Sequence, residues 1–280
     1  MSHARFMHCA RKLYCEPWAI TPAMHAQISD IFQRHVAGKS IDFEQPDDEA
    51  DPTEYDVIDG VAVLPIKGVI SKDISDMDRM SGAVDVEDVD AMLRSAMSRG
   101  DVDAIVLRVN SPGGSVDGVP ELADAVAEAA QIVPVFAYAD GLMASAAYYI
   151  AAGATAVYAS RSAEVGSIGV YIALLDQSAA YAQQGYKRDI IKSSDTPMKA
   201  AGYPGTSLTP EQRAVWQSQV DFLYGEFSGF VRAHRAVQDI ALDGRTFLAP
   251  FAVEAGLVDS VSSLQDAIRD AGAMGRKRKS

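Results

Sequence analysis

Ser145 is the side chain in this sequence best placed to act as a nucleophile. It follows the apolar run Val133–Ala139 and the pair Asp140-Gly141, which predict a buried strand that ends in a turn. Small residues and two tyrosines come next, so a helix is predicted to begin at Ser145. The N–H groups and the dipole at a helix start favour an oxyanion, although a serine there is more often only a helix cap.

A Pro-Gly-Gly turn one strand–helix unit earlier is the second candidate for catalytic chemistry. Gly113 and Gly114 follow Pro112 and can direct backbone N–H groups toward a ligand, as an oxyanion hole requires. Both this turn and Ser145 come directly after a predicted strand, which is where ligand sites lie in parallel sheets. Most Pro-Gly-Gly triplets are ordinary turns, so only this shared position favours a functional role for the triplet.

Lysines, rather than histidines, are the candidates for accepting the serine proton. None of the five histidines lies between residue 60 and the long helix expected after Thr209, and His234 is placed at the exposed end of that helix. A lysine base must be neutral, which needs burial because the ordinary lysine pKa is about 10.4. Lys199 lies in an uncharged stretch and is the preferred base, while Lys192 is the competing candidate.

Two further polar residues have supporting or structural interpretations. Ser167, in the run Val165–Gly169, is a candidate for orienting the lysine through a hydrogen bond, with a turn serine as the equal alternative. Asp259 is predicted to cap or pair structurally and is not assigned to catalysis.

The elements around these residues predict an α/β fold with a parallel sheet. Apolar residues at helical spacing predict helices over Val86–Arg99 and from about Val119 to Ile132, and the apolar run Asp103–Val109 predicts a buried strand between them. Repeated strand–helix units with buried strands are typical of such folds. An Asp-Gly pair predicts a hairpin over Val57–Val69.

Composition divides the chain into four parts. Residues 1–41 are predicted to form a helical arm around Pro22–Val36. Residues 42–59 contain nine acidic and no basic residues and are interrupted by two prolines, which is the composition of a linker. A catalytic domain is expected over 60–272, and 273–280 form a basic tail that is expected to be solvated.

The whole-chain composition favours a protein with a sizeable core. The chain has 280 residues, 48% of them hydrophobic, and a formal net charge of −13, which argues against nucleic acid as the main partner. The uncharged stretch Gly141–Ser160 predicts a buried helix and strand rather than a membrane span, and no signal peptide or anchor is expected. Cys9 and Cys15 match no metal spacing, so a cytoplasmic setting is expected, without a metal or cofactor.

Five motifs together resemble the signal-peptide-peptidase-A family of Ser-Lys serine peptidases. They are NSPGGSV, GLMASAAYYIA, EVGSIGVYIALLD, the segment that contains Lys192 and Lys199, and AVEAGLVDSV. The resemblance covers roughly residues 61–261. The leader and the stretch SLTPEQRAVWQSQVDFLYGEFSGFV are similar to the phage capsid-assembly (head-maturation) protease branch of that family.

This resemblance implies a Clp-protease/crotonase-like fold built of ββα units. The residues that it implies for the nucleophile, the base and the two oxyanion N–H groups are Ser145, Lys199, Gly114 and Ala146, with Gly113 and Ser167 in support. Alanines follow the serine here, whereas many members have glycines there, and Asp195-Thr196-Pro197 replaces a loop that usually contains glycine.

The function implied is that of a serine endopeptidase acting on peptide or protein substrates. For the phage branch these would be capsid, scaffold or portal proteins, cleaved in the host cytoplasm or the prohead. The resemblance also implies a homo-oligomer with active sites at subunit interfaces. The alternatives are a host-type signal peptide peptidase, a crotonase-like acyl-CoA enzyme and a catalytically dead assembly protein.

Overall fold

The computed structural model describes Leu13 and residues 16–36, 51–75, 78–79, 81–174, 176–203 and 206–279. The chain forms two compact units. The smaller unit consists of Met1–Pro17 and Val170–Gly225, and the larger unit consists of Trp18–Gly169 and Glu226–Ser280. Residues 42–50 of the expected linker lie outside the described part, and the four-part division of the chain stays a prediction.

A mainly parallel sheet forms the centre of the larger unit, with the strand order β11-β10-β8-β6-β3-β2. The parallel strands of this row are β3 (Val61–Lys67), β6 (Ala104–Ser111), β8 (Val135–Ala144) and β10 (Glu164–Gly166). The antiparallel edge strands are β2 (Asp56–Ile58) and β11 (Thr246–Leu248), and the strands that branch from β8 are β9 (Ala156–Ala159) and β12 (Ser260–Val261). The α/β class and the hairpin at the Asp-Gly pair are confirmed.

A second sheet in the same unit has the order β1-β7-β4-β5. Its strands are β1 (Trp18–Ile20), β7 (Gly113–Ser115), β4 (Ile70–Ser71) and β5 (Val84–Asp85). The chain passes from β3 through β4 and β5 into α4 (Val86–Ser98), and from β6 through β7 into α5 (Val119–Ile132). The ββα repetition is therefore present, and β8 leads directly to α6 (Ala146–Ala152).

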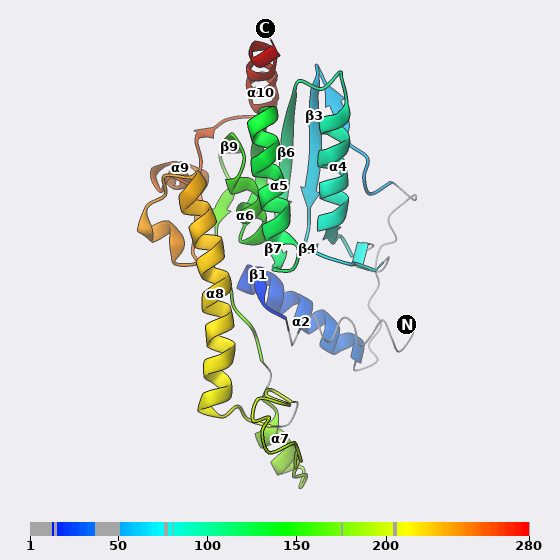
Figure 1. Cartoon of the computed structure of the whole chain (residues 1–280), viewed down its shortest axis with the longest axis vertical. Coiled ribbons are helices and arrows are strands. Elements are labelled where there is room, and N and C mark those ends of the chain that lie inside the picture. The colour runs from blue at the N-terminus through cyan, green and yellow to red at the C-terminus, as the bar shows by residue number, and fades with distance from the viewer. Residues whose placement is uncertain are drawn as a thin grey trace. The chain divides into compact units, whose positions relative to one another are not determined.

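Helices bury the large sheet. Residues of β3, β6 and β8 pack with α10 (Leu264–Lys279) in one core cluster, whose members are Val61, Ala104, Val106, Phe136, Tyr138, Ala267 and Ala271. Ile105 and Leu107, which alternate with the cluster residues along β6, are also fully buried. Helix α4 packs on β3, and α5 packs against both α4 and α6 (Figure 1). Strands buried in this way read as continuous apolar runs, which is why the sequence identified β6.

The remaining helices include two that the sequence predicted, α2 (Pro22–Val36) and α8 (Pro210–His234). The others are α7 (Ser178–Gln183), the 3-10 turn η1 (Asp239–Leu242) and α9 (Ala249–Glu254). Among the described residues, no helix combines the length and the apolar character that a membrane span needs. The stretch Gly141–Ser160 instead holds the buried helix α6 and the strand β9, as expected.

One sequence prediction about local structure is wrong. Asp140-Gly141 does not end its strand, because β8 continues to Ala144 across a shift in its register with β6. Gly141 takes a φ of 126°, which glycine tolerates, and Asp140 forms an ion pair with Arg108. The basic residues near the C-terminus continue α10 with exposed side chains, and Lys279 forms an ion pair with Asp103.

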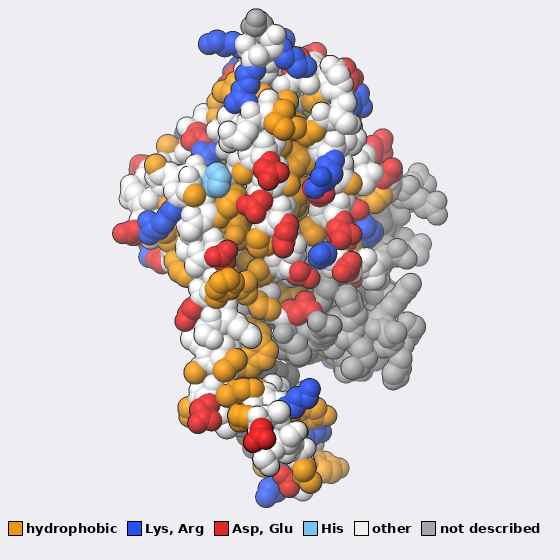
Figure 2. All heavy atoms as spheres, in the orientation of Figure 1, with side chains coloured by type: hydrophobic (Ala, Val, Ile, Leu, Met, Phe, Trp, Pro, Cys, Tyr) orange, Lys and Arg blue, Asp and Glu red, His pale blue; other side chains and the backbone are white. Residues whose placement is uncertain are grey.

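Acidic and basic side chains lie on different helices of the surface. Figure 2 shows acidic side chains over the face on which α5 lies, and Glu121, Asp124 and Glu128 form one exposed stripe of that helix. Basic side chains gather where α10 ends (Figure 2). Acidic groups on the visible helical surface therefore contribute to the strongly negative net charge of the sequence.

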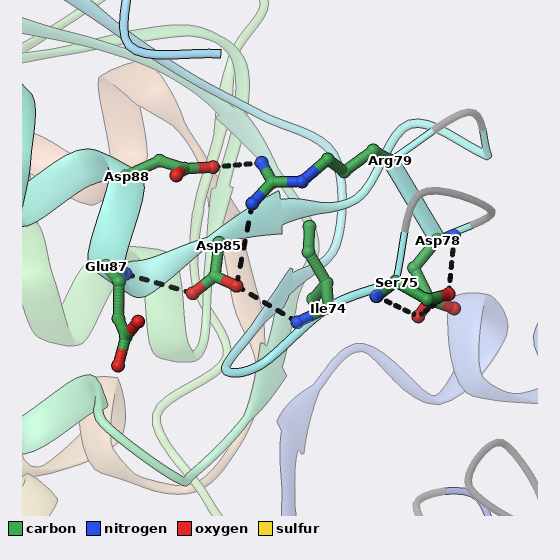
Figure 3. Close-up of polar contacts among 7 residues, drawn as sticks. All are labelled: Ile74, Ser75, Asp78, Arg79, Asp85, Glu87 and Asp88. Carbon is green, nitrogen blue, oxygen red and sulfur yellow. Dashed lines mark hydrogen bonds and ion pairs between the residues drawn. The ribbon is translucent and has the colours of Figure 1, made fainter. Parts of the chain in front are cut away.

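A buried carboxylate fixes the connection between β4 and α4 (Figure 3). Asp85 caps α4 by accepting a hydrogen bond from the Glu87 N–H at 3.0 Å, and it accepts a second bond from the Ile74 N–H at 3.0 Å. The guanidinium of Arg79 pairs with both Asp85 and Asp88. This network fixes the position of β5. Because β5 pairs with β4, and β4 pairs with β7, the network also supports the strand beside β7.

Candidate active site

Ser145 lies at the junction of β8 and α6 with a strained backbone. Its φ of 56° and ψ of −118° place a non-glycine residue where side chains are disfavoured. Its N–H donates to the Gly166 carbonyl at 2.8 Å, and its carbonyl accepts from the Tyr149 N–H at 2.9 Å. The residue is the N-cap of α6, but its side chain makes no cap hydrogen bond. The Oγ atom instead donates to the Gly169 carbonyl at 3.4 Å.

The Pro-Gly-Gly turn lies against this serine. A Cβ atom added to Gly113 would be 2.9 Å from the Ser145 Cβ and 2.9 Å from the Ala144 carbonyl oxygen, so only glycine fits at this φ of 95°. Gly114 belongs to β7, and a Cβ there would be 1.7 Å from the Ile70 carbonyl oxygen of β4. The structure therefore brings Gly113 beside the candidate nucleophile, as the sequence predicted from their common position after strands.

The segment after β10 completes the surroundings of Ser145. Strand β10 pairs in parallel with the end of β8, with Gly166 opposite Ala144. Ser167 follows with a φ of 54°, is almost fully buried, and donates its N–H to the Arg245 carbonyl at 2.7 Å. Its role as a partner of the base stays a prediction, since no contact between its hydroxyl and a lysine is observed among the described residues.

A buried guanidinium, that of Arg235, binds the C-terminal end of helix α6. Arg235 donates to the carbonyls of Ala152 and Ala154 at the end of α6, at 3.4 and 3.1 Å, and forms an ion pair of 2.7 Å with Asp259. Asp259 also accepts a bond from the Val157 N–H at 2.7 Å. This confirms the structural interpretation of Asp259, because its carboxylate ties α6 and β9 to the end of α8.

Two tyrosines anchor α6 in the core. The Tyr149 ring stacks on Phe227 of α8 with a centroid distance of 4.5 Å, and burial raises the pKa of Tyr149 to about 12. Tyr148 is fully buried and donates to the Leu257 carbonyl at 2.9 Å, and burial likewise raises its pKa. These contacts fix the helix that carries the Ala146 N–H, which belongs to the first turn, where N–H groups have no intrahelical acceptor.

Both lysine candidates belong to the smaller unit and are exposed there. Lys192 donates to the Pro197 carbonyl at 2.6 Å, and the Gln212 side-chain amide donates to the same oxygen at 3.1 Å. Lys199 lies in the turn that follows, with its N–H bonded to the Thr196 carbonyl at 3.0 Å. The candidate nucleophile is in the larger unit, so its pairing with Lys199 or Lys192 stays a prediction.

The structure describes two histidine side chains, those of His25 and His234. His234 is exposed at the end of α8, where its Nδ1 is 2.9 Å from the Phe230 carbonyl and its ring packs on the Phe230 ring. His25 packs against Trp18. Among the described residues, no group of three or more His, Cys, Asp or Glu side chains is arranged to hold a metal ion.

Strand β1 is the element of the site that the sequence did not predict. Its three residues pair with β7, the strand of the Pro-Gly-Gly turn. The only local signal is an aromatic and a β-branched residue in the short run Pro17–Pro22, which is too short to show a period of two. A strand of this length is recognised only through its partner.

Comparison with known proteins gives two family matches. The model of Peptidase family S49 matches residues 127–276, and the Clp protease model matches residues 82–165. The second match covers α4, β6, β7, α5, β8 and α6, so the expected Clp-protease/crotonase-like fold is confirmed.

Individual relatives include two phage proteins. The chain is 32% identical to "Capsid assembly protease C" of Escherichia phage lambda over 76% of this chain and 49% of that protein. It is 29% identical to "Head-tail preconnector protein GP5" of Enterobacteria phage P21 over 76% of this chain and 43% of that protein. A solved enoyl-CoA hydratase from Polaromonas sp. JS666 is 16% identical, covering 79% of this chain and 76% of that chain, with a TM-score of 0.43.

The chain spans about half the length of the curated phage relatives that it matches. The S49 match covers more than half of the chain and includes Ser145, the β10 loop and Lys199. It ends within α10, so it also includes the whole of α8 and the Arg235–Asp259 pair that supports α6. On this evidence the chain belongs to Peptidase family S49.

Proposed function

We propose that the chain is a serine endopeptidase in which Ser145 is the nucleophile. The observation that carries this proposal is the strained backbone of Ser145 beside the glycine strand β7. Holding a non-glycine residue in such a conformation costs about 1–3 kcal/mol, and strain of this kind concentrates at active sites. A serine that served only as a helix cap would bond to the first turn of α6, and Ser145 does not.

The proposed reaction follows from the groups around the serine. The Oγ atom attacks the carbonyl carbon of a peptide bond while a neutral lysine accepts the hydroxyl proton and passes it to the leaving amine. The backbone N–H groups of Gly114 and Ala146 stabilise the oxyanion. Water then releases the acyl group from Ser145, with the same lysine as base. Lys199 is our assignment for this base, and Lys192 is the alternative.

The proposed substrates are proteins of a phage capsid in assembly. Support comes from the names of the two phage relatives, one a capsid assembly protease and the other a head-tail preconnector protein. Scaffold and portal proteins are the specific candidates. A signal peptide peptidase of the host type is the close alternative, since a putative enzyme of that name from Enterococcus faecium is 32% identical over 60% of this chain.

Labelling with a serine-reactive phosphonate tests the nucleophile. The purified chain is incubated with the reagent and its intact mass is measured beside Ser145→Ala and Ser167→Ala. We expect one adduct on the unmodified chain and on Ser167→Ala, and none on Ser145→Ala. Labelling that survives in Ser145→Ala would show that Ser145 is not the labelled nucleophile. Absence of labelling from every form, together with no cleavage of capsid proteins, would favour an acyl-CoA enzyme or an inactive assembly protein.

A further inference from the structure

The edge of β7 beside the candidate nucleophile is already occupied by a segment of the same chain. Strand β1 runs antiparallel to β7, and its pairs are Trp18 with Ser115, Ala19 with Gly114 and Ile20 with Gly113. The Thr21 N–H extends this pairing by donating to the Pro112 carbonyl at 3.0 Å. An extended peptide therefore lies along the whole Pro-Gly-Gly-Ser segment.

The Ala19 carbonyl lies close to the proposed catalytic groups. A Cβ atom added to Gly113 would be 2.2 Å from the Ala19 oxygen and 2.9 Å from the Ser145 Cβ, so both atoms lie close to the same point beside Gly113. Residue pairs in an antiparallel ladder alternate between hydrogen-bonded and non-bonded types. Since the pair of Thr21 and Pro112 is bonded, the pair of Ala19 and Gly114, two residues further, is of the bonded type.

Strand β1 is anchored to the helix that follows it. All three of its side chains are buried, and the Trp18 ring meets the His25 ring of α2 edge-on at 5.5 Å. The Thr21 carbonyl accepts a hydrogen bond from the His25 N–H at 3.1 Å, at the start of α2. These contacts fix β1 to the start of α2.

We propose that Trp18–Ile20 is a resident peptide that fills the position of an extended peptide substrate and so limits access to Ser145. This inference rests on the proposed function, because it identifies the edge of β7 as the place where the substrate backbone pairs. Peptides that bind by strand addition gain affinity from backbone hydrogen bonds, which any extended sequence supplies. A tethered segment has an effective concentration on the order of millimolar, so it competes with free peptides.

A binding experiment tests this competition without needing catalysis. The probe is a fluorescein-labelled peptide with the sequence of residues 16–22, EPWAITP, and the protein is the full-length Ser145→Ala chain. In that background, Trp18→Ala with Ile20→Ala loosens β1, and Gln27→Ala on the exposed side of α2 is the matched control. We expect the loosened chain to bind the probe about ten-fold more tightly, as a larger fraction of sites becomes free, and the control to match the parent.

Two further measurements make the outcome decisive. Thermal melting identifies a loosened chain that does not fold, and Ile20→Ala alone then replaces the double variant. Equal affinity in the parent and a folded loosened chain, or equal binding of a scrambled probe, overturns the proposal. In the chain with Ser145 intact, loosening is expected to lower KM for a peptide substrate and to leave kcat unchanged. Absence of all cleavage contradicts the proposed function, while the binding result still decides the role of β1.

Discussion

Gly113 is the residue at which β1, the end of β8 and Ser145 meet. Replacing it with alanine should destabilise the chain by about 2–5 kcal/mol, the sum of a left-handed backbone strain of about 1–2 kcal/mol and overpacking of about 1–3 kcal/mol. The packing cost arises because the added methyl group would meet two carbonyl oxygens and the Ser145 Cβ. Urea unfolding measures the loss.

Gly82 supplies the control for this substitution. Its φ of 83° is similar, but a Cβ there would meet nothing within 4 Å. Gly82→Ala should therefore show only the backbone strain, about 1–2 kcal/mol. Equal losses in the two variants would mean that the close approach of Gly113 to Ser145 does not exist in solution.

The identity of the general base is also decided by single residues. Lys199→Ala is expected to abolish cleavage, and Lys199→Arg should not restore it, because arginine stays protonated. The measurement is the rate of peptide cleavage by each variant. Full activity in Lys199→Ala together with its loss in Lys192→Ala would transfer the role to Lys192.

The position of the candidate serine was predictable from the sequence, whereas its proposed base could only be ranked, for a physical reason. Ser145 and the Pro-Gly-Gly turn each lie at a strand end with small residues around them, and such features are local. A lysine base is defined by what buries it, which depends on residues far away in sequence. Lys199 and Lys192 both lie in a segment that forms few regular elements, so sequence pattern ranks them only by their immediate neighbours.

At the scale of elements, α6 depends on a guanidinium at its C-terminal end. Arg235→Ala should lower stability by about 2–3 kcal/mol, because the carbonyls of Ala152 and Ala154 lose a charged donor and Asp259 loses its partner. Arg235→Lys should recover part of this loss, since one ammonium group cannot reach all three acceptors. Urea unfolding with a probe of global structure gives the values.

Arg232 is the matched control on the same helix. Its ion pair with Asp239 is exposed, with 52% and 92% of the two side chains accessible, whereas the Arg235 side chain is only 8% accessible. Arg232→Ala should therefore cost less than about 1 kcal/mol. A loss as large as that of Arg235→Ala would show that burial does not distinguish the two pairs.

Long periodic elements were predictable, whereas the short and irregular ones were not. Helices α4 and α5 begin within one residue of the predicted positions, because each has an apolar stripe and a clear start signal. The turn predicted at Asp140-Gly141 fails because parallel pairing with β6 and β10 carries β8 past a pair that would otherwise turn. Strand β1 was not predicted, because a strand of three residues is too short to show the alternation of apolar and polar residues that identifies strands.

At the scale of the whole molecule, the sequence holds a single copy of the serine and Pro-Gly-Gly unit. The resemblance to longer members with two copies implies that the serine and the lysine come from different repeats, or from neighbouring subunits where only one copy exists. Four apolar residues in the sequence of α8 are candidates to bury such a contact: Trp216, Phe222, Leu223 and Phe227. Phe227 is wrong in this role, because it is buried under Tyr149 of the same chain.

Phe222 keeps that role as a prediction, since 66% of its side chain is exposed. An interface that buries large aromatic side chains is typical of symmetric homo-oligomers. We therefore expect the chain to form a homo-oligomer in solution. Phe222→Glu is expected to weaken assembly, as measured by light scattering, while the described fold of each chain stays intact.

Mixing two inactive variants tests whether subunits share an active site. Ser145→Ala and Lys199→Ala chains are each expected to be inactive, and subunit exchange between them should restore cleavage that rises with mixing time. The physical reason is that a hybrid oligomer contains interfaces where an intact serine from one chain meets an intact lysine from its neighbour. Combining the two changes in one chain is the control, because its exchange with Ser145→Ala chains supplies no intact serine. Hybrid oligomers, verified by mass, that stay inactive would show that each chain supplies its own pair.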